Sequence, residues 1–404
     1  MLLGKPSRRE RRAEEVLEVS RNRMLVALAS FALVLALLTA GCGQAAKTGK
    51  FKIGAILSLS GPSAPLGQSE QRSINLLKKQ LGTQGIKGTP VQFIILDDES
   101  DPAKATAAAN RLITQEKVCA IIGCSSTGST LAIMPSVEKS MVPVVAMAAG
   151  TKVTQPAKKW VFSVAPGDAL VIQRALMYFK DELKVQRIAV LHDSNAYGTG
   201  GVDEIKAQAP SFGITIVADE SYGSADTDMT PQLTKVDSTN AQALLVWGTN
   251  PGPASIAKNM QQLGMTLPFV GSSGIANKTF IDLAGSASNG VVFPASRLIL
   301  PSTIPAGSKW AKTVEDFSSA YQAEYKMPID TFAAHGWDAS KVIVNAIKSV
   351  GEDSAGIQAS IQKLASYPGV DGVFTYSATN HAGLKVDSLV MVKIENGQWV
   401  QAKP

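Results

Sequence analysis

Residues 118–130, VCAIIGCSSTGST, are the most informative stretch of this sequence. The stretch begins with a short apolar run that ends at Gly123, which is typical of a strand in a parallel sheet covered on both faces. Small hydroxyl residues follow, and the apolar residues after them (Leu131, Met134 and Val137) recur with helical spacing. The stretch therefore predicts a strand, a loop and a helix. In open α/β sheets, ligands bind at the carboxyl ends of the strands, which is where this loop lies.

The loop carries five hydroxyl side chains, and they allow two interpretations. These residues are Ser125, Ser126, Thr127, Ser129 and Thr130. In the first interpretation they only cap the following helix, which requires a single hydroxyl. In the second they bind a ligand, and the partial positive charge of the helix N-terminus favours an anionic group. Because there are five hydroxyls where capping needs one, we favour the second interpretation.

From residue 51 onward, strand patterns alternate with helical patterns. The predicted strands cover 51–57, 91–96, 118–122, 144–147, 187–191, 215–218, 243–247, 269–270 and 291–293. The predicted helices include 68–81, a helix that opens at Pro102, a helix after Gly200, 231–236, 253–263 and 275–283. This alternation predicts an α/β fold with parallel-type sheets in two successive lobes. Three later helices (308–325, 332–350 and 354–365) and two short strands (372–375 and 388–394) are too few for a third domain. We expect them to complete the first two, which makes both lobes discontinuous.

The N-terminal 41 residues have the pattern of an export signal. Two arginines precede an apolar run of about 15 residues, Met24–Leu38, which is short for a membrane span but suits a signal peptide. The following Thr39–Cys42 resembles a bacterial lipobox, which implies cleavage before Cys42 and lipid attachment to it. The alternatives are a plain signal peptide or a weak transmembrane anchor. Residues 1–20 are charged, so translation could instead start at Met24, and residues 42–50 are expected to form a flexible tether.

Composition excludes several classes of site. Aromatic residues make up only 6% of the chain, and half of the net charge of +6 lies in residues 1–41, so we expect no nucleic-acid surface. The cysteines Cys119 and Cys124 lie five residues apart across a strand end, about 16 Å if extended, which is too far for a disulfide. We expect both to be small buried residues, and we expect no metal site and no cofactor.

The chain resembles the leucine/isoleucine/valine-binding family of bacterial substrate-binding proteins, which serve ABC transporters. The resemblance rests on several short stretches in the same order over roughly 340 residues, behind the lipobox. They are GAILSLSGP at 54–62, DDESDP at 97–102, IGCSST at 122–127, HD at 192–193, YG at 197–198, FVG at 269–271, WDA at 337–339 and ENG at 395–397.

The resemblance implies an architecture and a role. The fold would be two Rossmann-like lobes joined by a three-crossover hinge, with lobe 1 formed by residues 51–167 and 298–384 and lobe 2 by residues 168–297 and 385–404. The chain would act as a monomer that binds a small molecule between the lobes and delivers it to an ABC permease and its ATPase. It would be exported and held on the extracytoplasmic side of the membrane by its lipid, and it would not be an enzyme.

The resemblance also implies which residues contact the ligand. In lobe 1 these are Leu66, Ser126, Thr127, Ala148 and Gly150, and in lobe 2 they are Tyr197, Asn250 and Ser273. Trp247, at a strand end, is expected either to form a wall of the site or to belong to the core.

Ser273 stands where amino-acid-binding members of the family place an acidic residue that pairs with the ligand ammonium. A serine supplies no countercharge. We therefore expect a small carboxylate or amide without a free ammonium, and a branched-chain amino acid is the alternative. Asp193 is the acid nearest by position that could replace the missing carboxylate.

Two further functions are compatible with the sequence. A hydrolase could use His192 beside Asp193 with one of the serines, although the chain has no Gly-x-Ser-x-Gly elbow, Walker loop or dinucleotide turn. A lipoprotein that senses a ligand for a membrane receptor would use the same two lobes.

Overall fold

The computed structural model describes residues 49–402. The expected signal peptide (1–41), the expected lipid anchor at Cys42 and nearly all of the expected tether lie outside the described residues. Within 49–402, no helix combines the length and apolar character needed to span a bilayer.

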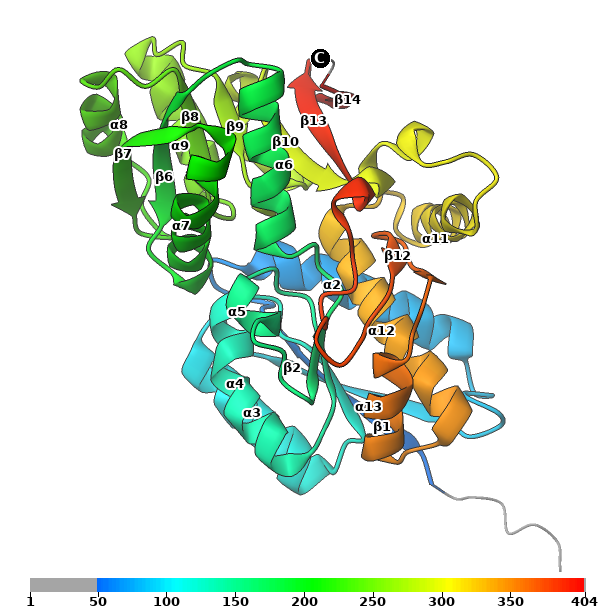
Figure 1. Ribbon diagram of the computed structural model, residues 1–404. Helices are drawn as coiled ribbons and strands as arrows, with labels where there is room; N and C mark the ends of the chain where they lie inside the picture. The colour runs from blue at the N-terminus through cyan, green and yellow to red at the C-terminus, as the bar shows by residue number, and fades with distance from the viewer. Residues whose placement is uncertain (1–48, 403–404) are drawn as a thin grey trace, which may run out of the picture. The chain divides into compact units, whose positions relative to one another are not determined.

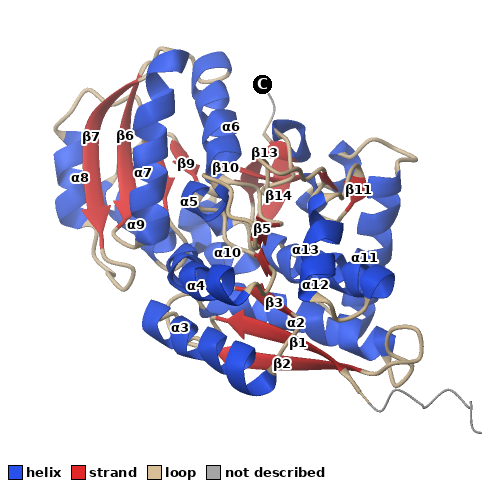
Figure 2. Cartoon of the chain, turned by 60° about the horizontal axis from the view of Figure 1, so that its bottom comes forward, coloured by secondary structure: helices blue, strands red, loops and turns tan. Residues whose placement is uncertain are grey.

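The first sheet contains five parallel strands in the order β2-β1-β3-β4-β5. Figure 1 labels β1 and β2, and Figure 2 shows β2, β1 and β3 side by side. These strands are β1 (Phe51–Leu57), β2 (Val91–Asp97), β3 (Ala120–Gly123), β4 (Val144–Ala146) and β5 (Val161–Ser163). Its main helices are α2 (Ala64–Leu81), α3 (Pro102–Arg111), α4 (Thr127–Ser140), the short α5 (Thr151–Thr154), α12 (Thr331–Val350) and α13 (Ser354–Gln362). A π-helical turn, Leu112–Glu116, continues α3.

Helices cover both faces of this sheet, as the apolar strand sequences predict. On β1, Ile53 and Leu57 belong to the hydrophobic cluster that includes α2 and α12, whereas Ile56 belongs to the cluster with α3 and α4. The alternation follows from the period of two along a strand. Helix α12 enters late in the chain, yet it packs directly on α2. Gly336 allows this approach because a Cβ there would lie 2.6 Å from the Glu70 carbonyl oxygen.

The second sheet contains seven strands in the order β14-β13-β10-β9-β8-β6-β7, all of which are labelled in Figure 1. The strands are β6 (Arg187–Asp193), β7 (Thr215–Tyr222), β8 (Ala243–Trp247), β9 (Phe269–Gly271), β10 (Val292–Ser296), β13 (Leu389–Glu395) and β14 (Gln398–Gln401). Helices α6 (Asp168–Asp181) and α7 (Ala196–Gln208) pack in one hydrophobic cluster on it, and α8 (Thr230–Asp237), α9 (Gly252–Leu263) and α10 (Lys278–Ala284) pack in another. Strands β13 and β14 run antiparallel, so the sheet is parallel only from β10 to β7.

The chain passes between the two sheets three times. The passages follow β5, follow β10, and lead into β13. Between the second and third passages lie α11 (Lys309–Tyr325), α12, α13 and a small hairpin of β11 (Tyr367–Pro368) and β12 (Val373–Phe374). The prediction of two α/β lobes joined by three crossovers is therefore confirmed.

The sequence expectation missed five of the helices and strands. These are α5, α6, β5, β11 and β14, of which only α6 is longer than four residues. Several bounds also differ: the expected helix 275–283 is a single 3₁₀ turn (Ser273–Ile275) followed by α10. Cys119 and Cys124 are free and buried, as expected.

Candidate functional site

A cavity of about 290 Å³ lies at the carboxyl ends of the strands of both sheets. Its lining comes from the loops after β1, β2, β3, β4 and β5, from the loops after β6, β7, β8 and β9, and from helix α12. This is the position at which open α/β sheets bind ligands. With room for roughly ten water-sized groups, the cavity suits a small solute.

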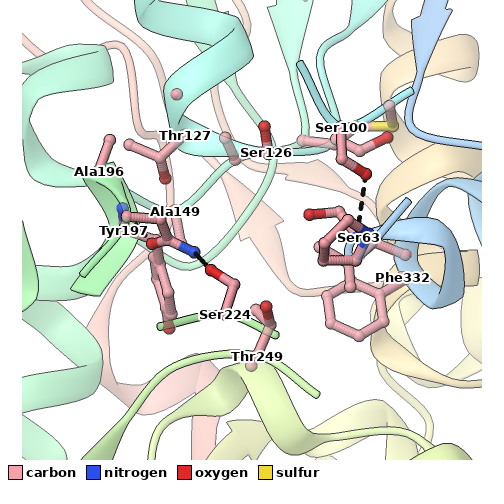
Figure 3. A pocket seen from close by; sticks show the side chains of 18 of the residues that line it. Ser63, Ser100, Ser126, Thr127, Ala149, Ala196, Tyr197, Ser224, Thr249 and Phe332 are labelled. Atoms are coloured by element: carbon pink, nitrogen blue, oxygen red, sulfur yellow. Dashed lines mark hydrogen bonds between the residues drawn. The ribbon is translucent and has the colours of Figure 1, made fainter. Parts of the chain in front are cut away.

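No charged side chain is found among the described residues that line this cavity. The polar lining consists mainly of hydroxyls: Ser63, Ser100, Ser125, Ser126, Thr127, Tyr197, Ser224, Thr249 and Ser273. Figure 3 shows Ser126 and Thr127 on one side of the cavity, with Tyr197 and Phe332 on two further sides. The site can therefore supply hydrogen bonds and apolar contacts, but no countercharge from its own lining.

The loop between β3 and α4 holds its hydroxyls in distinct environments. The Ser125 hydroxyl donates to the Glu70 carboxyl group and accepts a hydrogen bond from the Ser58 N–H at 3.1 Å. The Ser126 hydroxyl accepts from the Ser129 N–H at 3.2 Å and so caps α4. The capping interpretation is thus correct for Ser126. Thr127, the first residue of α4, lines the cavity without being needed as the cap.

Glu70 helps to hold this loop in place through Ser125. Its side chain is completely buried, and burial raises its pKa to about 8, while the hydrogen bond from Ser125 and the nearby Asp98 and Asp330 modify the shift. A neutral carboxyl group is favoured at neutral pH because the interior penalises its charged form. The group therefore fixes the Ser125 hydroxyl without adding a negative charge next to the cavity.

Tyr197 contributes from the second sheet, at the start of α7. The Asn195 side chain caps this helix by accepting from the backbone N–H groups of Tyr197 and Gly198, both at 3.0 Å. The Tyr197 ring stacks on Trp247 with centroids 5.8 Å apart. Its hydroxyl is buried and has no hydrogen-bond partner in the described part of the chain, and burial raises its pKa. The nearby Ser272 and Ser273 lower the pKa of Tyr197 in part, although neither forms a well-formed hydrogen bond with its hydroxyl.

Of the eight residues expected to contact a ligand, six line the cavity. They are Leu66, Ser126, Thr127, Ala148, Tyr197 and Ser273. Asn250 and Gly150 lie outside the lining. The Asn250 amide donates to the Asn277 side chain at 3.1 Å, and a Cβ on Gly150 would lie 2.4 Å from the Thr127 methyl carbon. Both residues therefore shape the wall from behind.

Two other sequence expectations concerned residues near this wall. Trp247 is fully buried and backs Tyr197 without lining the cavity, which is the core interpretation. Asp193 is also buried outside the lining, and its carboxylate accepts from the Asn195 N–H at 3.0 Å and the Ser224 hydroxyl at 2.7 Å. It therefore does not replace the carboxylate that is absent at Ser273.

Sequence reasoning missed two residues of α12, Phe332 and His335, which line the cavity. Their spacing of three places them on one side of a helix. That pattern alone could not reveal the cavity, since most of α12 is buried on every side. His192, considered for a hydrolase, lies outside the lining and bonds to the Asp193 carbonyl. Among the residues from 49 to 402, no group of three potential metal ligands comes together.

Comparison with known proteins identifies the family of this chain. A family model described as periplasmic binding protein matches residues 50–398. The chain belongs to the periplasmic binding protein family. Members of this family are binding proteins that work outside the cytoplasm, so the family resemblance found in the sequence is confirmed.

Relatives and solved structures extend the match over most of the chain. The Leu/Ile/Val-binding protein homolog 3 of Brucella melitensis is 25% identical over 352 residues, covering 86% of this chain and 92% of the relative. An extracellular ligand-binding receptor from Rhodopseudomonas palustris HaA2 superposes with a TM-score of 0.82 at 27% identity, covering 88% of this chain and all of the other. A leucine-binding protein, LivK, from Thermotoga maritima gives a TM-score of 0.80 at 26% identity, covering 87% and 97%.

Proposed function

We propose that this protein is the substrate-binding component of an ABC importer, which captures a small solute and delivers it to a membrane permease and its ATPase. Family membership supports the binding role, and the names of its relatives include Leu/Ile/Val-binding proteins. The cavity supports it further, because loops from both sheets line it. The protein acts as a monomer and is exported. A lipid on Cys42 anchors it to the membrane. Release of the full chain from membranes by high salt without detergent would contradict this anchor.

The two lobes, residues 51–167 with 298–384 and 168–297 with 385–404, close over the solute by bending at the three crossovers. The solute first meets the loop of Ser126 and Thr127 in lobe 1, and Tyr197 and Ser273 of lobe 2 then cover it. A ligand shifts such an equilibrium only by its greater affinity for the closed form. Because groups from both lobes line one cavity, a solute held between them makes more contacts in the closed form and therefore favours it.

The solute is a small carboxylate or amide that lacks a free ammonium group. The observation that carries this proposal is the absence of any charged side chain among the described lining residues. An ammonium buried there would have no countercharge, and burying an unpaired charge is costly. A carboxylate is better served, because the Thr127 hydroxyl and the N-terminus of α4 both favour negative charge.

Each expected site residue has a part in this arrangement. Thr127 and Ser126 meet the carboxylate or amide, while Leu66 and Ala148 supply apolar surface. Tyr197 and Ser273 contact the solute from the second lobe. Gly150 leaves room for Thr127, and Asn250 holds the loop after β8 through Asn277.

Calorimetry on purified, ligand-stripped protein tests the ligand class. Leucine, isoleucine and valine are compared with the corresponding 2-oxo acids and simple carboxylic acids. We expect at least one ammonium-free acid to bind about tenfold or more tightly than its amino acid. Micromolar or tighter leucine binding, with no heat from the analogues, would contradict the proposed ligand and favour a branched-chain amino acid. The transport role would remain.

A further inference from the structure

His335 is a buried polar residue of the cavity wall that the proposed function does not use. It lies one helical turn after Phe332 on α12, and both residues line the cavity. Only 4% of its surface is exposed. The Phe332 ring meets the imidazole edge to face, with centroids 5.7 Å apart, which limits how the imidazole can turn.

The two ring nitrogens of His335 are buried and have no hydrogen-bond partner among residues 49–402. The two other histidines of the chain differ from it. Nδ1 of His192 bonds to the Asp193 carbonyl oxygen at 2.9 Å, and Nδ1 of His381 bonds to the Val161 carbonyl oxygen at 2.8 Å. Buried polar groups in folded proteins are nearly always hydrogen-bonded. A residue whose role was only structural would be expected to resemble His192 or His381.

The nearest carboxyl group does not satisfy His335. Its Nε2 lies 3.7 Å from an Asp371 oxygen, beyond hydrogen-bond distance. Burial raises the pKa of Asp371 well above its ordinary value, and the adjacent Asp338 raises it further. Asp338 accepts N–H bonds from Val370 at 2.8 Å and from Asp371 at 2.9 Å, so the negative charge of the pair is favoured on Asp338.

His335 is consequently a neutral imidazole, and burial lowers its pKa to about 3. A neutral imidazole has one N–H donor and one nitrogen acceptor. It can bond a hydroxyl, carbonyl or amide of a bound molecule. It offers no countercharge to an ammonium or to a second carboxylate.

We infer that His335 is a recognition residue, which hydrogen-bonds an uncharged oxygen-bearing group of the solute. This inference rests on the proposed function, in which Thr127 meets the carboxylate or amide, and it narrows the ligand to a hydroxy or oxo acid, or its amide. The group bonded to His335 is a second polar group on the same molecule. Phe332 beside it contacts the apolar part of the solute.

The test uses carboxylic acids that differ only by one oxygen-bearing group. Benzoate is compared with its three monohydroxy isomers, and pentanoate with 4-oxopentanoate, by calorimetry on the ligand-stripped chain. At least one oxygenated acid should bind wild-type protein about tenfold more tightly than its parent. His335→Leu and His335→Phe should reduce that ratio to about one, because neither can hydrogen-bond. His335→Gln, which restores a donor and an acceptor, should recover part of the preference.

Other outcomes overturn the inference in distinguishable ways. The role of His335 is contradicted if a folded apolar variant keeps the wild-type ratio of affinities for the oxygenated and parent acids. It is also contradicted if wild-type protein never prefers an oxygenated acid. Both results leave the carboxylate proposal in place. A wild type that binds none of these acids contradicts the ligand class, and the inference falls with it. Circular dichroism and thermal unfolding establish folding, and if one apolar variant fails to fold, the other decides.

Discussion

The two sides of the cavity are built in different ways. On the side of the first sheet, the loop before α4 is fixed by hydrogen bonds: Ser125 to Glu70 and Ser58, and Ser126 to the N-terminus of α4. On the side of the second sheet, Tyr197 is fixed mainly by packing on Trp247, and its hydroxyl has no partner. On the first side the polar groups are thus fixed by hydrogen bonds, and on the second side the Tyr197 ring is fixed by packing.

This difference suggests how affinity and specificity divide between the two sides. Preorganised donors lose little freedom when a charged group binds, so the first side should dominate the affinity for a carboxylate. The second side should contribute contact area and stability. Substitutions that damage one side and not the other can therefore test this division.

The largest expected effect comes from removing the support of the second side. Trp247→Ala deletes a fully buried indole behind Tyr197 and should lower the free energy of unfolding by about 3–5 kcal/mol. Urea denaturation followed by circular dichroism measures the loss. Trp247→Phe is the control, because it keeps a ring behind Tyr197 and should cost much less. A loss below about 1 kcal/mol for Trp247→Ala would mean that packing does not hold this side together.

The next effect concerns the buried Glu70 behind the first side. Its pKa is raised from 4.5 to about 8, so between these values the folded protein keeps a proton that the unfolded chain releases. Stability conferred by this group is therefore lost as the pH rises from about 4.5 to about 8, and it changes little above that. Glu70→Gln stays neutral and can still accept from Ser125, so it should be more stable than wild type by about 2–4 kcal/mol at pH 8 and nearly equal near pH 4.5.

Urea unfolding of both proteins across this pH range measures the difference. Other buried acids, such as Asp330 and Asp371, are present in both proteins, so their contributions cancel to first order. Glu99→Gln, at an exposed position, is the matched control for the loss of one carboxyl group. A constant difference between Glu70→Gln and wild type at all pH values would show that Glu70 does not keep its proton in the folded state.

The sequence predicted the first side of the cavity better than the rest. The loop at 123–130 can be recognised from the sequence, because a strand, a run of hydroxyl residues and a helix follow one another within 13 residues. Phe332 and His335 lie some 200 residues later and reach the cavity only because Gly336 lets α12 pack against α2. Asn250 is polar and follows a strand, yet it turns toward Asn277. Tertiary contacts of this kind produce no local sequence pattern. The same holds for the antiparallel direction of β13, which depends on the third crossover.

The smallest expected effect addresses the division of binding directly. Thr127→Ala removes one hydroxyl from the polar side while leaving the Ser126 cap of α4 intact. Binding of a carboxylate should weaken by about 1.5–3 kcal/mol, the range for a hydrogen bond to a charged group, and the free energy of unfolding should change little. Thr127→Ser, which keeps the hydroxyl, should lose much less.

Tyr197→Phe is the matched change on the opposite side, and it should weaken binding of the same carboxylate by only about 0.5–1.5 kcal/mol. Calorimetry with the tightest acid found above gives all three values. If Tyr197→Phe costs more than Thr127→Ala, the aromatic side rather than the hydroxyl loop holds the carboxylate, and the two sides exchange the roles assigned to them here.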